Sequence, residues 1–236
     1  MTDRRRIGFD NPHADLGFDN PEFWNFMYDD ETAPWLIDGP QPVIADLVRQ
    51  GLVRGRVLEP GCGSGEHTIL FTRLGYDCLG TDLSPSAVEY ARRTAVQKGA
   101  PAARFEVANM LRPDDYPFLT PGFDTVVDVA MFHGFGAYGD NLDVAKEYAA
   151  VLHDICNPNA LVHVLAHADA GPGLSSGISA EVIKESFATG WAIESVELST
   201  YRARVTELIA QEAADSGLPA DGPVELPAWL VRLRRL

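Results

Sequence analysis

The sequence predicts an α/β fold in which a mostly parallel β-sheet carries helices on both faces. Short apolar segments alternate with longer segments of helical periodicity, which is typical of parallel strands joined by crossover helices. The first of these strands runs directly into a glycine-rich turn that opens a helix. Two late segments, 191–202 and 225–236, alternate apolar and polar residues and are expected to form an antiparallel hairpin at the sheet edge.

Five strands are expected before that hairpin, and each is followed by a helix or a loop. The strands are expected at 56–59, 77–81, 103–108, 123–129 and 161–167. Helices fit 66–74, 86–98, 142–155 and 179–189. The second helix has the clearest ends, because Ser84 before Pro85 is a cap followed by proline in the first turn, and Gly99 is a stop at the C-terminal end.

The composition predicts one domain, or at most two, without a membrane span. The chain has 236 residues, 46% of them hydrophobic, and no apolar run approaches the roughly 18 residues needed to cross a bilayer. Basic residues near the start are followed by Gly8 to Pro12 instead of an apolar segment, so no secretion signal is expected. Three cysteines with no C-x-x-C pair favour a reducing cytoplasm and predict neither a metal site nor a disulfide. We expect a monomer or a homodimer.

The charge predicts small-molecule partners. The net charge is −15, which would repel a polyanion, whereas nucleic-acid binding draws most of its strength from Lys and Arg contacts to phosphates. Basic residues cluster at 4–6 and 232–235, and we interpret both groups as solvated faces. No nucleic-acid partner is therefore expected.

The glycine-rich turn is the clearest functional motif. It reads Leu-Glu-Pro-Gly-Cys-Gly-Ser-Gly-Glu-His-Thr over residues 58–68. Glycines at this spacing let the backbone turn with positive φ and approach a ligand closely. A dinucleotide loop reads G-x-G-x-x-G and places a pyrophosphate on the helix N-terminus. Here the third glycine comes one place early and Glu66 occupies the phosphate position, where it would repel an anion, so a dehydrogenase is disfavoured.

This turn resembles motif I of the class I S-adenosylmethionine-dependent methyltransferases, whose cofactor has a cationic methionine end. The resemblance covers about 56–236 and implies a Rossmann-like, seven-stranded sheet. It implies that cofactor-binding residues lie in the turn, at the end of the second strand and at the end of the third: Glu59, Gly61, Gly63, Gly65, Asp82, Leu83, Asn109 and Met110.

Two of these positions carry specific expectations. Asp82 lies 23 positions beyond Glu59, where such enzymes hold the ribose hydroxyls, although dinucleotide enzymes place an acid at a similar distance. The family's usual residue at position 109 is Asp, and this chain has Asn. An amide can still accept a hydrogen bond from the adenine amine.

The segment before the first strand, 20–55, resembles the N-terminal lid of the thiopurine, halide and thiol methyltransferases. Its aromatic residues include Trp24, Tyr28 and Trp35, and the resemblance implies that the tryptophans contact the cofactor and Tyr28 the substrate. Aromatic faces attract a cation such as a sulfonium, by about 1–2 kcal/mol when desolvated. The alternative is that the tryptophans only hold an amphipathic helix on the core. Residues 1–19 are expected to be a flexible extension.

The acceptor side is expected beyond the carboxyl ends of the fourth and fifth strands. His133 could take a proton or orient a hydroxyl, Phe132 and Phe135 could sandwich a flat ring, and Tyr138 could donate a hydrogen bond. His167 ends the fifth strand and could face the same cleft, with a glycine-rich loop at 171–177 as a cover. The alternative for each histidine is a structural imidazole. His163 is expected to pack in the sheet.

The function that this pattern favours is methyl transfer from S-adenosylmethionine to a thiol, hydroxyl or ring heteroatom of a small aromatic or heterocyclic molecule, in detoxification or secondary metabolism. Such an in-line displacement needs no nucleophile from the enzyme, and a base only if the acceptor is protonated.

His67 is expected to contact the methionine end or cap the turn. No carboxylate cluster for a metal is evident, since Asp128 lies deep in its strand, so no metal is expected. The alternative is a cofactor-binding protein or a lyase-like descendant that methylates nothing.

Overall fold

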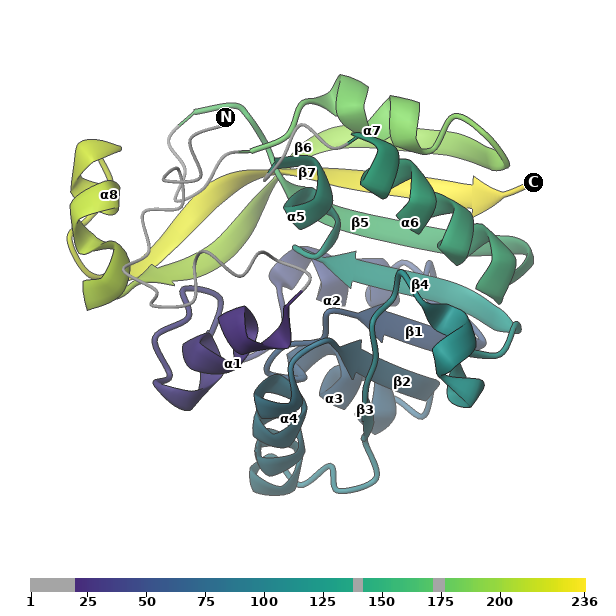
Figure 1. Ribbon diagram of the computed structural model, residues 1–236, viewed down its shortest axis with the longest axis horizontal. Helices are drawn as coiled ribbons and strands as arrows, with labels where there is room; N and C mark the ends of the chain where they lie inside the picture. The colour runs from purple at the N-terminus through teal and green to yellow at the C-terminus, as the bar shows by residue number, and fades with distance from the viewer. Residues whose placement is uncertain (1–19, 138–141, 172–176) are drawn as a thin grey trace.

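A seven-stranded sheet forms the centre of the molecule, with strand order β3-β2-β1-β4-β5-β7-β6 (Figure 1). The structure, a computed structural model, describes residues 20–137, 142–171 and 177–236. Strands β1 to β5 pair in parallel, and β7 pairs antiparallel with both β5 and β6. The predicted fold class is confirmed, including the antiparallel hairpin at the edge.

The seven strands lie where the apolar segments predicted them. Their bounds are β1 Arg56–Pro60, β2 Asp77–Asp82, β3 Arg104–Val107, β4 Phe123–Val129, β5 Cys156–His167, β6 Trp191–Val205 and β7 Gly222–Arg235. β5 begins at Cys156, earlier than residue 161, because a polar stretch there still pairs with β4 across a register shift between Phe123 and Thr125. Asn159 in this stretch has φ of 64°, which a pattern of apolar residues cannot indicate.

Eight α-helices lie in the described residues. Their bounds are α1 Pro21–Asp29, α2 Pro42–Arg49, α3 Glu66–Arg73, α4 Pro85–Gln97, α5 Phe132–Ala137, α6 Leu142–Ile155, α7 Ala180–Ser186 and α8 Ala210–Asp215. The four predicted helices correspond to α3, α4, α6 and α7. At the start of α4 the hydroxyl of Ser84 accepts from the amide of Ala87 at 3.0 Å, as predicted. The helices α5 and α8 were not predicted.

Two hydrophobic cores cover the two faces of the sheet. Alternate residues of one strand point to opposite sides, so Val126 belongs to one core and its neighbour Val127 to the other. The first core lies under α6 and α7 and includes Tyr148, Leu152 and Phe187. The second lies under α2 and α3 and includes Ile44, Leu47 and Phe71. Helices therefore pack on both faces, and none in the described ranges is long and apolar enough to span a membrane.

The segment 20–41 contacts both α4 and β6. Met27, Tyr28 and Leu36 form a small cluster with Ala87 of α4. Further along, the amide of Arg204 in β6 donates to the carbonyl of Pro34 at 2.8 Å. In Figure 1 this segment lies beside the end of β1, where the glycine-rich turn begins. It is thus positioned over that turn.

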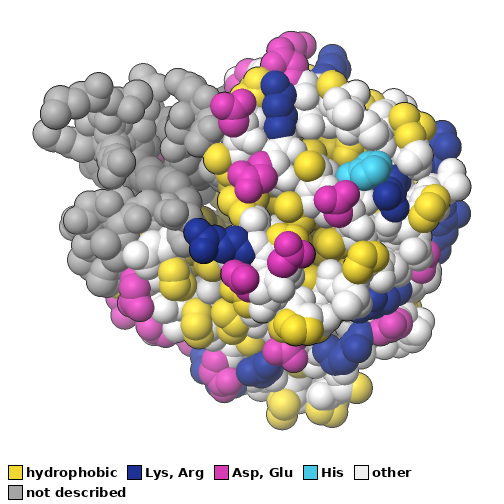
Figure 2. All heavy atoms as spheres, turned by 45° about the vertical axis from the view of Figure 1, so that its right-hand side comes forward, with side chains coloured by type: hydrophobic (Ala, Val, Ile, Leu, Met, Phe, Trp, Pro, Cys, Tyr) yellow, Lys and Arg dark blue, Asp and Glu magenta, His cyan; other side chains and the backbone are white. Residues whose placement is uncertain are grey.

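The C-terminal arginines are paired with acidic residues of the neighbouring strand. Arg232 lies 3.2 Å from Glu197 and Arg234 lies 2.8 Å from Glu194, both across the β6–β7 pair. Figure 2 shows a face on which acidic and basic side chains are interspersed among apolar ones. The basic run of residues 232–235 is therefore neutralised in part by its own sheet.

Candidate functional site

The glycine-rich turn between β1 and α3 requires its glycines. Gly63 and Gly65 have φ of 52° and 80°, in the left-handed region that favours glycine. A Cβ on Gly63 would lie 2.7 Å from the hydroxyl of Tyr28, and a Cβ on Gly65 would lie 2.7 Å from Cε1 of Phe105. Gly61 is equally enclosed, because a Cβ there would lie 2.9 Å from Cβ of Met131. The turn is therefore in close contact with the lid segment on one side and with the end of β4 on the other.

Asp82 joins this turn to the end of β2. Its Oδ2 accepts from the amide of Gly63 at 3.0 Å, and its Oδ1 accepts from the amide of Ser84 at 2.9 Å. Burial raises the pKa of the Asp82 carboxyl to about 6, although these two amide bonds act in the opposite direction. Each oxygen keeps a second lone pair, so the group fits the acceptor that ribose hydroxyls require. Leu83 lies beside it, partly buried.

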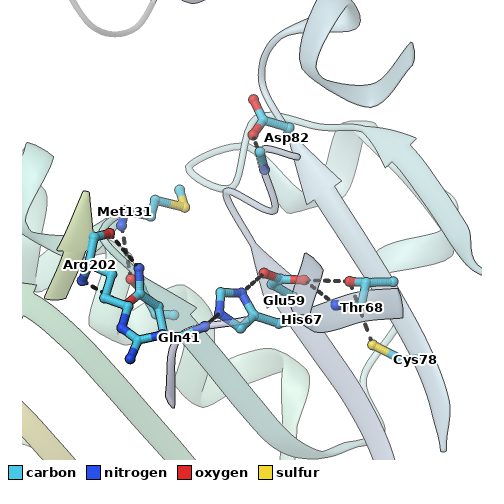
Figure 3. Close-up of polar contacts among 10 residues, drawn as sticks. Gln41, Glu59, His67, Thr68, Cys78, Asp82, Met131 and Arg202 are labelled. Atoms are coloured by element: carbon cyan, nitrogen blue, oxygen red, sulfur yellow. Dashed lines mark hydrogen bonds and ion pairs between the residues drawn. The ribbon is translucent and has the colours of Figure 1, made fainter. Parts of the chain in front are cut away.

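Glu59 is held entirely by groups of its own chain (Figure 3). One oxygen lies 2.8 Å from Nδ1 of His67, and the other accepts from the amide of Thr68 at 2.8 Å and from its hydroxyl at 2.5 Å. The side chain is 1% exposed. Glu59 therefore supports the turn from inside the protein, a role that the sequence did not predict.

Three aromatic side chains of the lid segment gather beside Gly63. The indole Nε1 of Trp35 donates to the hydroxyl of Tyr28 at 2.8 Å. The ring centroids of Trp24 and Trp35 lie 5.9 Å apart. A Cβ on Gly63 would come within 3.9 Å of Trp35. The structure thus brings the glycine turn together with the two tryptophans that the sequence assigned to the cofactor and with Tyr28, which it assigned to the substrate. Aromatic faces in this arrangement suit a cationic group.

The two residues after β3 differ in what they can present to a ligand. Asn109 is half-buried, and its Oδ1 accepts from the amide of Leu111 at 2.9 Å in a local turn. Met110 is buried in the core, where its sulfur accepts from the hydroxyl of Thr81 at 3.5 Å. Asn109 could therefore offer its side chain to a base, whereas Met110 could offer only its backbone.

Asp128 positions the helix α5 at the acceptor side. Its Oδ1 accepts from the amides of Met131 and Phe132 at 3.0 and 3.1 Å, and its Oδ2 accepts from the hydroxyl of Tyr148 at 2.8 Å. Burial raises the pKa of this carboxyl to about 6. This capping explains why a helix forms where two glycines in Phe132–Ala137 predict a loop.

His133 and His167, which come from different elements, stack on one another. Their ring centroids are 4.3 Å apart with an interplanar angle of 16°, and the ring of Tyr201 lies 4.6 Å from His167. Burial lowers the pKa of His133 well below its ordinary value and that of His167 to about 4, so both are neutral at pH 7. Tyr201 was missed by the sequence analysis, because only its buried place in the alternation of β6 marks it.

The remaining acceptor-side residues are placed differently from one another. Phe132 is fully buried between Tyr148 and Phe187, with ring centroids at 6.3 and 5.3 Å, so a substrate could reach it only if this core opened. Phe135 is partly buried and lies 5.0 Å from Tyr148. His163 is packed in the sheet as expected, with Nε2 2.8 Å from the carbonyl of Leu52. Tyr138 and most of the glycine-rich loop, 172–176, lie outside the described residues.

A stability measurement tests the burial of His167. The unfolded chain takes up a proton at this residue below about pH 6.5, whereas the folded chain does so only near pH 4, so folding stability falls as the pH is lowered through that window. We expect His167→Asn to gain about 2 kcal/mol in free energy of unfolding, relative to the unmodified protein, between pH 7 and pH 4.5. Urea unfolding at both pH values checks this, and a difference that does not change with pH would contradict it.

The described residues contain no group of three His, Cys, Asp or Glu side chains that could hold a metal ion. Cys62, Cys78 and Cys156 are buried free thiols. The polar groups of the site are thus those of the turn, the lid segment and the histidine pair.

Comparison with known proteins supports the family that this geometry indicates. A family model described as a methyltransferase domain matches residues 57–154. The 2-heptyl-1-hydroxyquinolin-4(1H)-one methyltransferase of Mycobacteroides abscessus is 26% identical over 207 residues, which cover 86% of this chain and 88% of that protein. A probable thiol methyltransferase of Arabidopsis thaliana is 32% identical over 114 residues, which cover 48% of this chain and 49% of that protein.

One solved structure matches this chain over most of its length. It comes from work on the conversion of a disulfide bond into a thioacetal group during echinomycin biosynthesis, and it is 33% identical to this chain. The two superpose with a TM-score of 0.75 over 92% of this chain and 93% of the other. The chain therefore belongs to the class I S-adenosylmethionine-dependent methyltransferases that act on small molecules, and S-adenosylmethionine is its cofactor.

Proposed function

We propose that this enzyme moves the methyl group to a thiol, an acidic hydroxyl or a ring heteroatom of a small aromatic or heterocyclic molecule, without a metal. The observation that carries the proposal is the stacked pair of His133 and His167 at the carboxyl ends of β4 and β5. The relatives support it, since one is named for a hydroxyquinolone and another for a thiol. Detoxification or secondary metabolism in the cytoplasm would fit such a substrate.

The cofactor is proposed to lie on the glycine-rich turn. Asp82 would hold the ribose hydroxyls, Asn109 and the backbone of Met110 would meet the adenine, and Trp24 and Trp35 would cover the methionine end. The lone pairs that remain on Asp82, and the position of Trp35 beside Gly63, support this placement. Residues 20–55 would then be the lid and 56–236 the methyltransferase domain. When bound, S-adenosylmethionine supplies an electrophilic methyl group on its sulfonium.

The basicity of the histidine pair limits the choice of acceptor. A neutral imidazole can accept a proton, but one whose pKa is about 4 is too weak a base to draw a proton from an aliphatic alcohol. Thiols, with a pKa near 8.5, and acidic hydroxyls give up a proton far more readily. The acceptor is therefore expected to ionise easily, and the chain would contribute chiefly orientation of the acceptor in line with the methyl group.

The acceptor itself would lie against the ring faces at this edge of the sheet. Tyr201 and His167 contact one another, with ring centroids 4.6 Å apart and an interplanar angle of 68°, and the pair is proposed to form the aromatic base of the acceptor site. Tyr28 and Phe135 are proposed to complete the substrate surface from the lid and from α5. Tyr138 is proposed to donate a hydrogen bond to the acceptor.

His133→Ala provides the test of this acceptor site. With a phenol as acceptor we expect kcat to fall by about 100-fold, because the imidazole that would accept a hydrogen bond from the hydroxyl and orient it in line with the methyl group is lost, while the Kd for S-adenosylmethionine stays within about twofold. With a thiol that is already ionised at the pH of the assay, the fall in kcat should be much smaller. Equal losses for both acceptors would show that His133 only supports the structure, and no loss for either would remove it from the site.

A further inference from the structure

We propose that His67 is a positioning residue that couples the N-terminal lid to the cofactor turn, with Glu59 as its partner. The proposal rests on the proposed placement of S-adenosylmethionine at that turn. In it, neither His67 nor Glu59 needs to touch the reacting atoms. They act by fixing the position of the lid relative to the turn.

Both ring nitrogens of His67 are used, one toward the lid and one toward β1 (Figure 3). The backbone amide of Gln41 donates to Nε2 at 3.0 Å. Because Nε2 accepts, the proton of the neutral ring lies on Nδ1, which donates to Glu59 at 2.8 Å. All three residues are buried, with 8%, 2% and 1% of His67, Gln41 and Glu59 exposed. In such surroundings each lost bond leaves a desolvated polar group without its partner.

Further hydrogen bonds join the lid to the sheet. The side-chain amide of Gln41 donates to the carbonyl of Arg202 at 2.9 Å, and its Oε1 accepts from the amide of Arg202 at 2.8 Å. This two-bond pairing fixes the lid to β6, the same strand that carries Tyr201. A continuous chain of hydrogen bonds therefore joins β1, the start of α3, the lid and β6.

A second contact, at the surface, also joins the start of α3 to the lid. Nζ of Lys98, at the end of α4, lies 2.7 Å from Glu66 and 2.5 Å from Asp38 of the lid. The Asp38 side chain is 96% exposed, so this ion pair is worth little. Glu66 and His67 are consecutive, and each is linked to the lid. The link through His67 is buried, whereas the ion pair of Lys98 with Asp38 is open to water.

The lid and the cofactor turn are coupled because the two carboxylate oxygens of Glu59 bind different partners. One binds His67, and the other holds the amide and hydroxyl of Thr68 in the first turn of α3. A displacement of the lid at Gln41 would pull His67, and with it Glu59, away from the geometry that supports the glycine turn. Lid position and cofactor affinity are therefore expected to change together.

Two substitutions separate the two bonds of His67. His67→Asn can still donate to Glu59 but is too short to accept from Gln41, whereas His67→Phe keeps a ring and removes both bonds. Hydrogen–deuterium exchange of residues 36–45 reports the lid, and calorimetry with S-adenosylhomocysteine reports the turn. We expect both variants to speed exchange of this segment and to raise the Kd, by roughly fivefold in His67→Asn and more in His67→Phe.

His163→Phe is the matched control, because His163 is also a buried, hydrogen-bonded histidine, but its bond is to the carbonyl of Leu52, outside both the turn and the exchange window of 36–45. It should lower thermal stability with an unchanged Kd and unchanged exchange over 36–45. An unchanged Kd and unchanged lid exchange in His67→Asn would overturn the coupling. A wild-type protein that fails to bind S-adenosylhomocysteine would instead defeat the cofactor placement on which the coupling rests.

Discussion

Asp82→Ala is expected to raise the Kd for S-adenosylhomocysteine by about 100-fold or more. Hydrogen bonds to a carboxylate contribute about 1.5–3 kcal/mol each, and the proposed ribose contact makes two of them. The substitution also removes the acceptor of the Gly63 and Ser84 amides, at 3.0 and 2.9 Å, which hold the turn. Titration calorimetry measures the Kd. An affinity within a few-fold of the wild type would contradict the assignment of Asp82 to the ribose.

The pH dependence of the Kd for S-adenosylhomocysteine shows how much the charge of Asp82 contributes to binding. Because the pKa of Asp82 is raised to about 6, the carboxylate is lost as the pH falls below that value. The wild-type Kd for S-adenosylhomocysteine should therefore rise between pH 7 and pH 5. Asp82→Asn should bind more weakly at pH 7 and show no such dependence. A wild-type Kd that stays constant over this range would show that the charge does not contribute.

Gly63→Ala is expected to raise the same Kd by about 50-fold. The added Cβ would lie 2.7 Å from the Tyr28 hydroxyl, and φ of 52° is unfavourable for any residue with a Cβ, by about 1–2 kcal/mol. To relieve the contact, Tyr28 and with it Trp35 would have to move from the turn.

Gly75→Ala is the matched control for this substitution. Gly75 has φ of 86°, and a Cβ there would meet nothing within 4 Å. The positive φ should therefore make Gly75→Ala lower the folding stability about as much as Gly63→Ala does, as measured by thermal unfolding. The affinity for the cofactor should not change. If both alanine variants bind S-adenosylhomocysteine as the wild type does, the turn is not the cofactor site.

The parts of the molecule that could be predicted from the sequence are those with local signals. The strands are marked by apolar segments, and the turn of Gly61 to Gly65 by its glycine spacing. The cap at Ser84 is likewise a property of four neighbouring residues. Each of these depends on a few consecutive positions, and the structure places them as expected.

The parts that could not be predicted depend on contacts between distant positions. The helix α5 forms because Asp128, from the preceding strand, caps it and is itself held by Tyr148. Tyr201 contacts His167 from β6, a strand that comes later in the chain and is separated from β5 in the sheet by β7. The bonds from His67 to Glu59 and to Gln41 explain why the acid of the turn is buried, and no local pattern encodes them.

Turnover on a defined set of acceptors tests the central claim most directly. The full chain would be incubated with S-adenosylmethionine and flat aromatic thiols, phenols, N-hydroxy heterocycles and aliphatic alcohols, with and without EDTA. Release of S-adenosylhomocysteine would be read alongside the mass gain of one methyl group. We predict methylation of one or more of the first three classes, unaffected by EDTA, and none of the aliphatic alcohols. Methylation of aliphatic alcohols alone, or of no acceptor by a protein that binds S-adenosylmethionine tightly, would contradict the proposed function.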